Sequence, residues 1–327
     1  MVAFCGRRGL LAKWGIAGLT TAALVVAGGL AYEKVAEHLD QQRYPPPGQR
    51  IDIGARQLHL FCRGSGSPTV LIEAGAGSDS AAWFGVVDRL SKFTRTCAYD
   101  RAGMGWSDAA PDPRTIDGLV DDIQALLDKS GIEGPLILVG HSFGGRLMRL
   151  LAQRTPNRVT GLVLVDSSDD SRLASLERQA SRDYNREHSL RLGWAARFGL
   201  LRVLARVWPE RFDPIQRSPA DLHADRLAHY LRPTGHFARA QEVTASQNFH
   251  PTGEASGALA DLPLVVVSRA VPQTPNAEDL AWQGVQLRLA ALSRKSQHLA
   301  ARQGGHEINF DDPEIIVEAV RTLMRTE

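Results

Sequence analysis

The segment "PLILVGHSFGG", residues 135–145, decides the fold class of this 327-residue chain. An apolar run suited to a buried strand ends abruptly in glycine, histidine, serine and two further glycines. Residues 140–144 match the pattern G-x-S-x-G, in which a sharp turn from strand to helix pushes a serine hydroxyl out of the sheet. Gly140 and Gly144 suit this turn because larger side chains would collide there. The segment therefore predicts a nucleophilic Ser142, and the alternative is a glycine-rich turn with a capping serine.

Apolar runs typical of strands alternate with amphipathic, helix-like segments from residue 50 onward. This alternation predicts a mostly parallel α/β sheet with helices on both faces, and such sheets bind ligands at the carboxyl ends of their strands. The eight predicted strands are a hairpin over residues 50–64 and single strands within 68–77, 94–103, 135–140, 159–167, 262–268 and 297–303.

One interval interrupts the alternation. Residues 169–257 are helical in pattern, rich in arginine and dotted with aromatic residues, and they are too numerous for a loop. We expect a helical cap inserted between two strands of one sheet, within a single domain over residues 50–327. Trp83, Trp106, Trp194, Phe198, Phe237 and Trp282 are candidates for lining a pocket, with core packing as the alternative.

The N-terminus has a different pattern. Residues 1–13 carry three basic residues, whereas residues 14–32 carry no charge and would nearly span a hydrocarbon core of about 30 Å as a helix. Basic residues before such a helix stay in the cytoplasm, so the rest of the chain should lie outside it. We expect a membrane anchor; a cleaved signal peptide, with a weak site at Gly29 and Ala31, is the alternative. Residues 33–49 then form a helical stalk and a proline-rich spacer.

Composition and charge exclude several classes of function. The net charge of +2 and the absence of a basic stripe with aromatics argue against a nucleic-acid partner. Three cysteines are too few for a disulfide scaffold and lack the spacing of metal ligands. Cys5 should face the cytoplasm. Cys62 and Cys97 lie in predicted strands, where buried free thiols are the default expectation, although the compartment permits a bridge.

A serine nucleophile needs a base, because its hydroxyl is weakly nucleophilic at neutral pH. His306 follows Gly304 and Gly305 in the loop after the last predicted strand, at the ligand edge of the sheet. It is therefore the candidate base; a solvated loop histidine is the alternative.

The order of elements and the segments "VGHSFGG" (139–145), "YDRAGMGWSD" (99–108) and "GGHEINFDDPEIIVEAV" (304–320) resemble the α/β-hydrolase superfamily, in its serine esterase and peptidase branch. The resemblance runs from about residue 50 to the C-terminus and is weakest in the cap. It implies Ser142 as nucleophile and His306 as general base, with oxyanion-hole N–H groups from Ala76 and Phe143. The family often has His-Gly where this chain has Ala74 and Gly75. This departure leaves the expected oxyanion-hole donor in place, because that donor is a backbone N–H group.

The acid of the implied triad has two possible locations. The family most often places it after the strand in 262–268, but there the first acids are Glu278 and Asp279, which also suit the first turn of a helix. Some relatives use the end of the preceding strand, where Asp166 stands. A carboxylate buried there would need a partner. We expect Asp166, with Asp279 and Glu278 as alternatives.

The expected activity is cleavage of a small-molecule ester, carboxylesterase- or lipase-like, through an acyl-enzyme and without metal or organic cofactor. One alternative is an aminopeptidase or amidase of the same fold. Another is a catalytically inactive binding module tethered to the membrane. The sequence leaves the substrate and the oligomeric state open.

Overall fold

The structure is a computed structural model that describes residues 5–110, 113–169, 176–212, 220–248 and 257–325. Eight strands form one sheet in the order β1-β2-β4-β3-β5-β6-β7-β8, parallel except where β2 pairs with β1 and β4. This topology confirms the predicted sheet. The strands are β1 (Gln49–Asp52), β2 (Gln57–Arg63), β3 (Thr69–Glu73), β4 (Thr96–Tyr99), β5 (Leu136–His141), β6 (Val159–Val165), β7 (Leu264–Ser268) and β8 (Ser296–Ala300).

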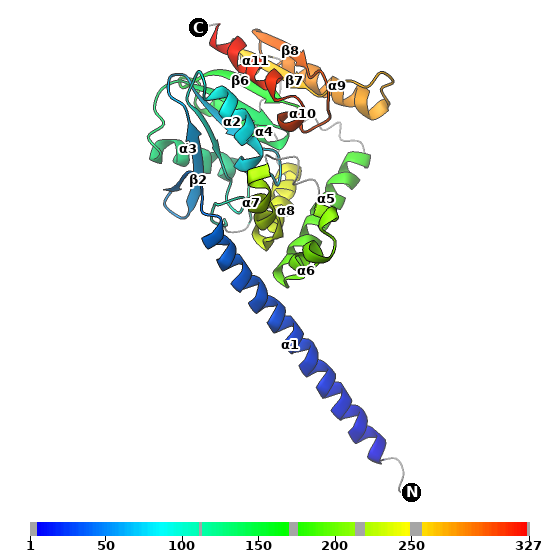
Figure 1. The fold of residues 1–327 in the computed structure, drawn as a ribbon. Helices are drawn as coiled ribbons and strands as arrows, with labels where there is room; N and C mark the ends of the chain where they lie inside the picture. The colour runs from blue at the N-terminus through cyan, green and yellow to red at the C-terminus, as the bar shows by residue number, and fades with distance from the viewer. Residues whose placement is uncertain (1–4, 111–112, 170–175, 213–219, 249–256, 326–327) are drawn as a thin grey trace.

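Helices cover both faces of the sheet (Figure 1). Strand β5 shows why: Leu138 belongs to one core cluster and Val139 to the other, because successive side chains of a strand point to opposite faces. The first cluster includes residues of α3 (Ile116–Lys129), α4 (Phe143–Arg154) and α9 (Ala277–Ala290). The second includes residues of η1 (Ser80–Trp83), α2 (Phe84–Leu90), α10 (Ile308–Asp311) and α11 (Pro313–Met324).

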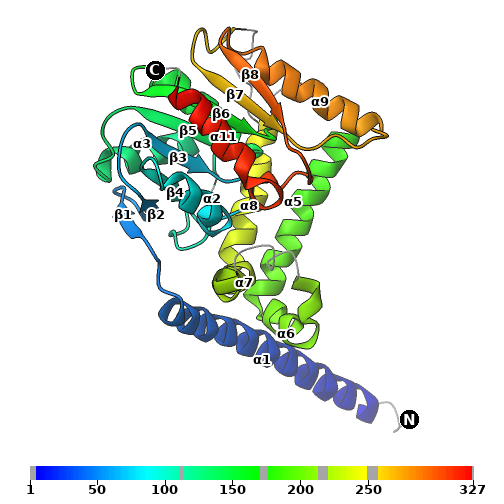
Figure 2. The same cartoon turned by 45° about the horizontal axis from the view of Figure 1, so that its top comes forward.

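Further helices lie between β6 and β7, in the interval for which the sequence predicts a helical cap. They are α5 (Leu176–Arg197), α6 (Leu200–Val207), η3 (Ala220–Leu222), α7 (His223–Leu231) and α8 (Pro233–Asn248). Ala196, Leu201 and Leu231 form a small core of their own there. Figures 1 and 2 show these helices between the sheet and α1.

The N-terminal helix α1 (Cys5–Arg43) is continuous through the predicted anchor and stalk, with no break near residue 32. Its part Ile16–Arg43 is long and apolar enough to cross a membrane, a property that a signal sequence shares. Apolar side chains such as Leu24 and Val25 point into open space, as they would on a helix surrounded by lipid.

The expectation that Cys62 and Cys97 are buried free thiols is wrong. Cys62 and Cys97 are not free thiols but form a disulfide across β2 and β4. The antiparallel register places Cys62 directly opposite Cys97, with their Cα atoms 4.1 Å apart. The sequence puts both residues in strands, but only the register makes them neighbours.

Replacing both Cys62 and Cys97 by alanine should lower the free energy of unfolding by about 4 kcal/mol, because the bridge restricts the unfolded chain over a separation of 35 residues. Urea unfolding of the full chain in mild detergent, with and without the bridge, measures this difference. A change below about 1 kcal/mol would contradict the prediction, since typical bridges contribute at least twice that.

Candidate active site

The predicted nucleophile lies at the corner between β5 and α4. Ser142 has φ 52° and ψ −118°, a strained conformation for a residue with a side chain. A Cβ on Gly140 would lie 2.5 Å from Gly145 Cα, and one on Gly144 would lie 2.6 Å from Ala74 O. The N–H of Ser142 donates to Val165 O over 3.0 Å, which ties the corner to the end of β6. Glycines are therefore required on both sides of the serine.

The predicted base and one predicted acid are in contact. His306 Nδ1 lies 2.7 Å from Asp166 Oδ2, and Asp166 is fully buried just after β6. The second carboxylate oxygen accepts hydrogen bonds from Trp282 Nε1 (2.8 Å) and from the N–H of Arg269 (3.0 Å). Three nitrogen atoms thus fix one carboxylate, which in turn orients the partly exposed imidazole of His306.

The alternative acids lie elsewhere. Asp279 forms a capping box with Asn276 at the start of α9, and its ion pair is with Arg269 at 3.6 Å. Glu278, in the same first turn, is exposed. Both have the helix-capping environment that the sequence already suggested for them. The structure brings Asp166, and not Asp279, to His306.

Asp166 is held in its charged form. Burial alone would raise the pKa of this carboxyl group, but the hydrogen bond and charge of His306, together with Trp282 and the Arg269 N–H, lower the pKa below its usual value. A carboxylate at this position accepts the Nδ1 proton of His306. That tautomer leaves Nε2 free to take a proton from a nucleophile.

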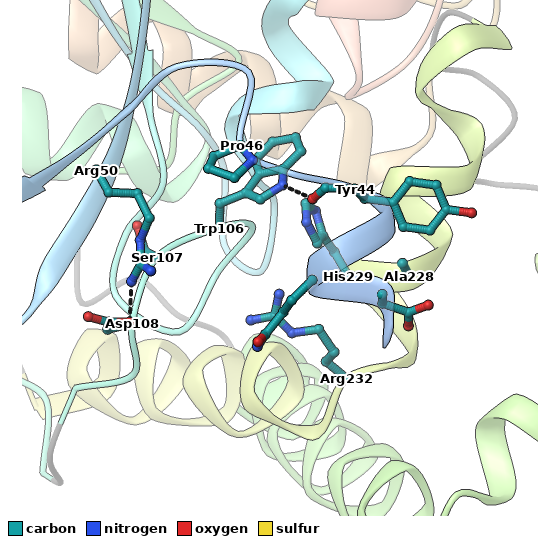
Figure 3. Close-up of a pocket in the computed structure, with 11 residues that line it drawn as sticks. Tyr44, Pro46, Arg50, Trp106, Ser107, Asp108, Ala228, His229 and Arg232 are labelled. Carbon is teal, nitrogen blue, oxygen red and sulfur yellow. Dashed lines mark hydrogen bonds and ion pairs between the residues drawn. The ribbon is translucent and has the colours of Figure 1, made fainter. Parts of the chain in front are cut away.

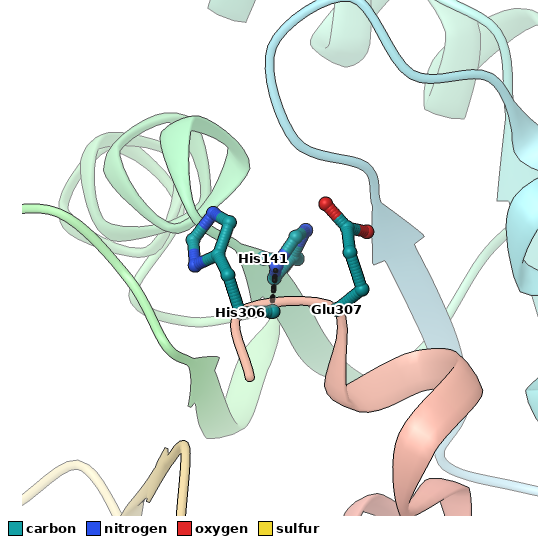
Figure 4. A group of neighbouring side chains, drawn as sticks. All are labelled: His141, His306 and Glu307. Carbon is teal, nitrogen blue, oxygen red and sulfur yellow. Dashed lines mark hydrogen bonds between the residues drawn. The ribbon is translucent and has the colours of Figure 1, made fainter. Parts of the chain in front are cut away.

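His141, which precedes the serine, supports the loop that carries His306. Its Nε2–H donates to the carbonyl of His306 over 2.9 Å, and the two rings are 4.6 Å apart (Figure 4). Burial and the neighbouring His306 lower the pKa of His141 to about 4. This role was not predicted from the sequence, where the only signal for it is the position of a histidine inside the G-x-S-x-G pattern.

The neutral, buried His141 should make the protein sensitive to acid. Between pH 6.5 and 4 the unfolded chain binds a proton at this residue and the folded chain does not, so stability falls as the pH falls. The contribution is about 3 kcal/mol over this range. His141→Gln should remove it, whereas His236, whose pKa is also lowered to about 4 by burial, still titrates in that variant. Urea unfolding at pH 7 and pH 4.5 tests this; equal pH dependence in both proteins would contradict it.

The loop after β3, which carries the predicted donor Ala76, lies beside Ser142. A Cβ built on Gly75 would be 3.4 Å from Ser142 Cβ. Arg101 holds this loop by donating to Ala74 O (2.8 Å) and Gly75 O (2.7 Å). The second predicted donor, Phe143, begins α4, so its N–H has no partner within the helix.

A buried ionic cluster connects this loop to the cap. Arg101 bonds to Glu73 at the end of β3 and, over 2.7 Å, to Glu242 of α8. Glu242 also accepts the N–H of Gly77 over 3.0 Å. Arg101 lies in the segment 99–108 that resembles the family, but no local pattern of the sequence singles out Glu242 as its partner. The cluster sets the position of the loop relative to both the sheet and the cap.

One group of side chains in the described part of the chain has the spacing of metal ligands. Ligand atoms of His141, His306 and Glu307 lie within 4.8 Å of one another (Figure 4). His141 Nε2 and His306 Nδ1 are already used by the carbonyl and by Asp166. A metal would need the remaining nitrogen of His306, which acyl transfer also needs, so the two uses exclude each other.

Among the described residues, two cavities near the cap bear on the site. One, of about 260 Å³, is lined by Tyr44, Trp106, His229, Arg232 and other residues between the end of α1 and α7, and its lining includes neither Ser142 nor His306 (Figure 3). The other, of about 80 Å³, adjoins the loop after β3 at Gly77.

A family model of the alpha/beta hydrolase fold matches residues 68–198, which contain Ser142 and Asp166. Together with the sheet topology, this match confirms that the chain has the α/β-hydrolase fold that its motifs resemble.

Individual proteins are similar to this chain over different extents. A protein of Hormonema carpetanum named as a probable transporter, efuK, is 39% identical over 128 residues, which are 37% of this chain and 18% of that protein. The uncharacterized protein YqjL of Bacillus subtilis is 23% identical over 79% of this chain and 84% of its own length. The crystal structure of an enol-lactonase from Burkholderia xenovorans LB400 is 21% identical, has a TM-score of 0.62, and covers 85% of this chain and 100% of its own.

Proposed function

We propose that this protein is a serine hydrolase that cleaves a carboxylic ester through an acyl-enzyme. Ser142 is the nucleophile, His306 the general base and Asp166 the acid of the triad. The observation that carries the proposal is the 2.7 Å contact between His306 and the buried Asp166, at the sheet edge where the strained Ser142 lies. β5 and β6 are adjacent and parallel, so their carboxyl ends bring Ser142 and Asp166 to one place.

The proposed reaction has two halves. Ser142 Oγ attacks the carbonyl carbon while His306 Nε2 takes the hydroxyl proton, and the N–H groups of Ala76 and Phe143 bind the oxyanion. The intermediate then expels the alcohol, which receives that proton from His306. In the second half, a water molecule loses a proton to His306 and attacks the acyl carbon. The bond from the acyl carbon to Ser142 Oγ then breaks, Oγ takes that proton from His306, and the acid is released.

An ester is preferred to a peptide with a free amino group because of charge near the site. The cavity beside Gly77 is lined by Asp79 and by three arginines, Arg226, Arg232 and Arg239. Such a lining repels the ammonium group that an aminopeptidase must bind. The enol-lactonase with a similar fold is named for a cyclic ester, which agrees with this choice.

The test uses the full chain in mild detergent with nitrophenyl esters of increasing acyl length, aminoacyl nitroanilides and a fluorophosphonate probe. We expect ester hydrolysis, weaker or absent release from the nitroanilides, and covalent labelling. Faster turnover of the nitroanilides would favour the aminopeptidase alternative. If the protein shows no turnover of either substrate and no labelling by the probe, the proposal is overturned in favour of an inactive binding module.

We also propose that α1 remains as a membrane anchor and that the hydrolase domain lies outside the cytoplasm. The Cys62–Cys97 bridge suits an oxidising compartment. The alternative, secretion after cleavage near Gly29 or Ala31, would release a chain without residues 1–31. The mass of the protein purified from membranes distinguishes the two.

A further inference from the structure

Helix α6 carries an apolar stripe on its outer face. Leu200, Val203 and Val207 are 49%, 48% and 58% exposed and follow the spacing i, i+3, i+7, which places them on one side of a helix. The adjoining side, with Leu201 and Leu204, already packs into the small core of the cap. The exposed stripe therefore has no role in holding the cap together.

Aromatic side chains extend this stripe at both ends. Trp194 in the last turn of α5 and Phe198 in the turn before α6 are 53% and 39% exposed, and Trp208 after α6 is 51% exposed. Trp194 and Phe198, which the sequence suggested for a pocket, thus lie largely at the surface. We call Trp194, Phe198, Leu200, Val203, Val207 and Trp208 the cap corner. Exposed apolar patches of this kind mark sites of interaction.

The cap corner is held against α1 (Figure 2). A Cβ on Gly29 would lie 2.6 Å from Phe198 O, and a Cβ on Gly199 would lie 2.5 Å from Tyr32 Cδ1. The buried Arg202 of α6 bonds to Glu33 over 2.8 Å and to Asp40 over 2.6 Å. Phe198 and Gly199 therefore contact α1 inside its uncharged segment, while Arg202 binds the acidic residues just beyond that segment.

This contact determines the depth of the cap corner relative to the anchor. Gly29 lies three residues inside the end of the uncharged segment at Tyr32, which is about 4.5 Å along a helix axis. Amphipathic surfaces at the membrane interface are buried by about 5–10 Å, and tryptophan is enriched at that level. Two nearby basic side chains suit lipid headgroups: Arg197, whose guanidinium lies 5.7 Å from the Trp194 ring, and the exposed Arg206.

We propose that the cap corner inserts into the outer leaflet of the lipid bilayer beside α1, so that the protein contacts the membrane through its cap as well as through its anchor. The partner is the lipid itself, because Phe198 of the corner contacts α1 at Gly29, inside the uncharged segment that the bilayer would surround. This inference rests on the proposed membrane anchor and is independent of the proposed chemistry. If water filled a gap between the corner and the bilayer, six apolar side chains would stay exposed to water beside lipid. Their transfer into the lipid is favourable, because it removes apolar surface from water.

The test places nitroxide labels on the full chain in phosphatidylcholine vesicles, in a Cys5→Ser background. Leu200→Cys and Val203→Cys report on the cap corner, Val25→Cys on the anchor, and Leu287→Cys, from a 60% exposed leucine on α9, is the matched control. We measure the accessibility of each label to oxygen, which enters lipid, and to a nickel chelate, which stays in water. The ratio of oxygen to nickel accessibility at residues 200 and 203 should be several-fold higher than at residue 287, and close to that at residue 25.

Three outcomes would overturn the inference. Nickel accessibility at residues 200 and 203 equal to that at 287, with residue 25 in lipid, would show that the corner faces water. Low accessibility to both reagents would show that protein, such as a second copy of this chain, covers it. A label at residue 25 that faces water would remove the anchor and the inference together, while ester hydrolysis by the same preparation would still support the proposed function.

Discussion

Replacing Ser142 by alanine will lower kcat/KM for nitrophenyl esters by about 10⁴- to 10⁶-fold, the range found when an acyl-enzyme nucleophile is removed. The residue would no longer form the covalent intermediate, and only binding and the two proposed oxyanion donors would remain. The fluorophosphonate label should disappear in parallel. Because Ser142 has φ 52°, a strained value for serine and alanine alike, the substitution should leave the fold intact.

The matched control is Ser168→Ala. Its hydroxyl lies 3.4 Å from the carbonyl oxygen of Ser142, so it shares the corner but has no role in the proposed chemistry. We expect activity within a few-fold of the original protein and full labelling by the probe. Retention of labelling in Ser142→Ala, or equal losses in both variants, would contradict Ser142 as the nucleophile.

Replacing Asp166 by asparagine will lower kcat by about 10⁴-fold, with a much smaller change in KM. An amide at this position can donate to His306 Nδ1 and would hold the ring in the wrong tautomer, with its proton on Nε2. Asparagine has nearly the shape of aspartate, so the hydrogen bonds to Trp282 and to the Arg269 N–H can still form. Steady-state kinetics of the two proteins, with thermal unfolding as a check on folding, measure the effect.

The control for this experiment is Asp279→Asn, at the alternative acid. Asp279 closes the capping box of α9, so its loss should cost about 1 kcal/mol of stability and leave kcat within a few-fold. A large loss of kcat in Asp279→Asn with normal kcat in Asp166→Asn would reverse the assignment. Large losses in both would indicate that Asp279 acts through Arg269, which contacts both carboxylates.

Local patterns were sufficient to predict the sheet and the serine corner. Strand β5 is identified by a short apolar run, and the crowding around Gly140 and Gly144 is a consequence of turning within a few residues. The same reasoning identified α1, because an uncharged segment of that length has few alternatives. These features depend on residues close together in the chain, and the structure agrees with them.

Long-range pairings were not predictable in this way. The disulfide depends on the register of β2 against β4, and a shift of one residue would separate Cys62 from Cys97. The contacts of Arg101 with Glu242 join residues 141 positions apart, so no local pattern indicates them. In the sequence, the exposed stripe of α6 has the same spacing as a stripe that faces a core. The spacing alone therefore does not show whether that face is covered.

The sequence by itself determined the class of the sheet, the conformation required of Ser142 and the position of His306 after the last strand, since each follows from sterics or alternation within a short segment. Only the tertiary structure decided which carboxylate lies against His306. Asp166 and His306 are 140 residues apart, and both Asp166 and Asp279 follow strands at the same edge of the sheet. The choice depends on where the loop after β8 returns across the ends of β6 and β7, and that path is set by packing of the whole domain.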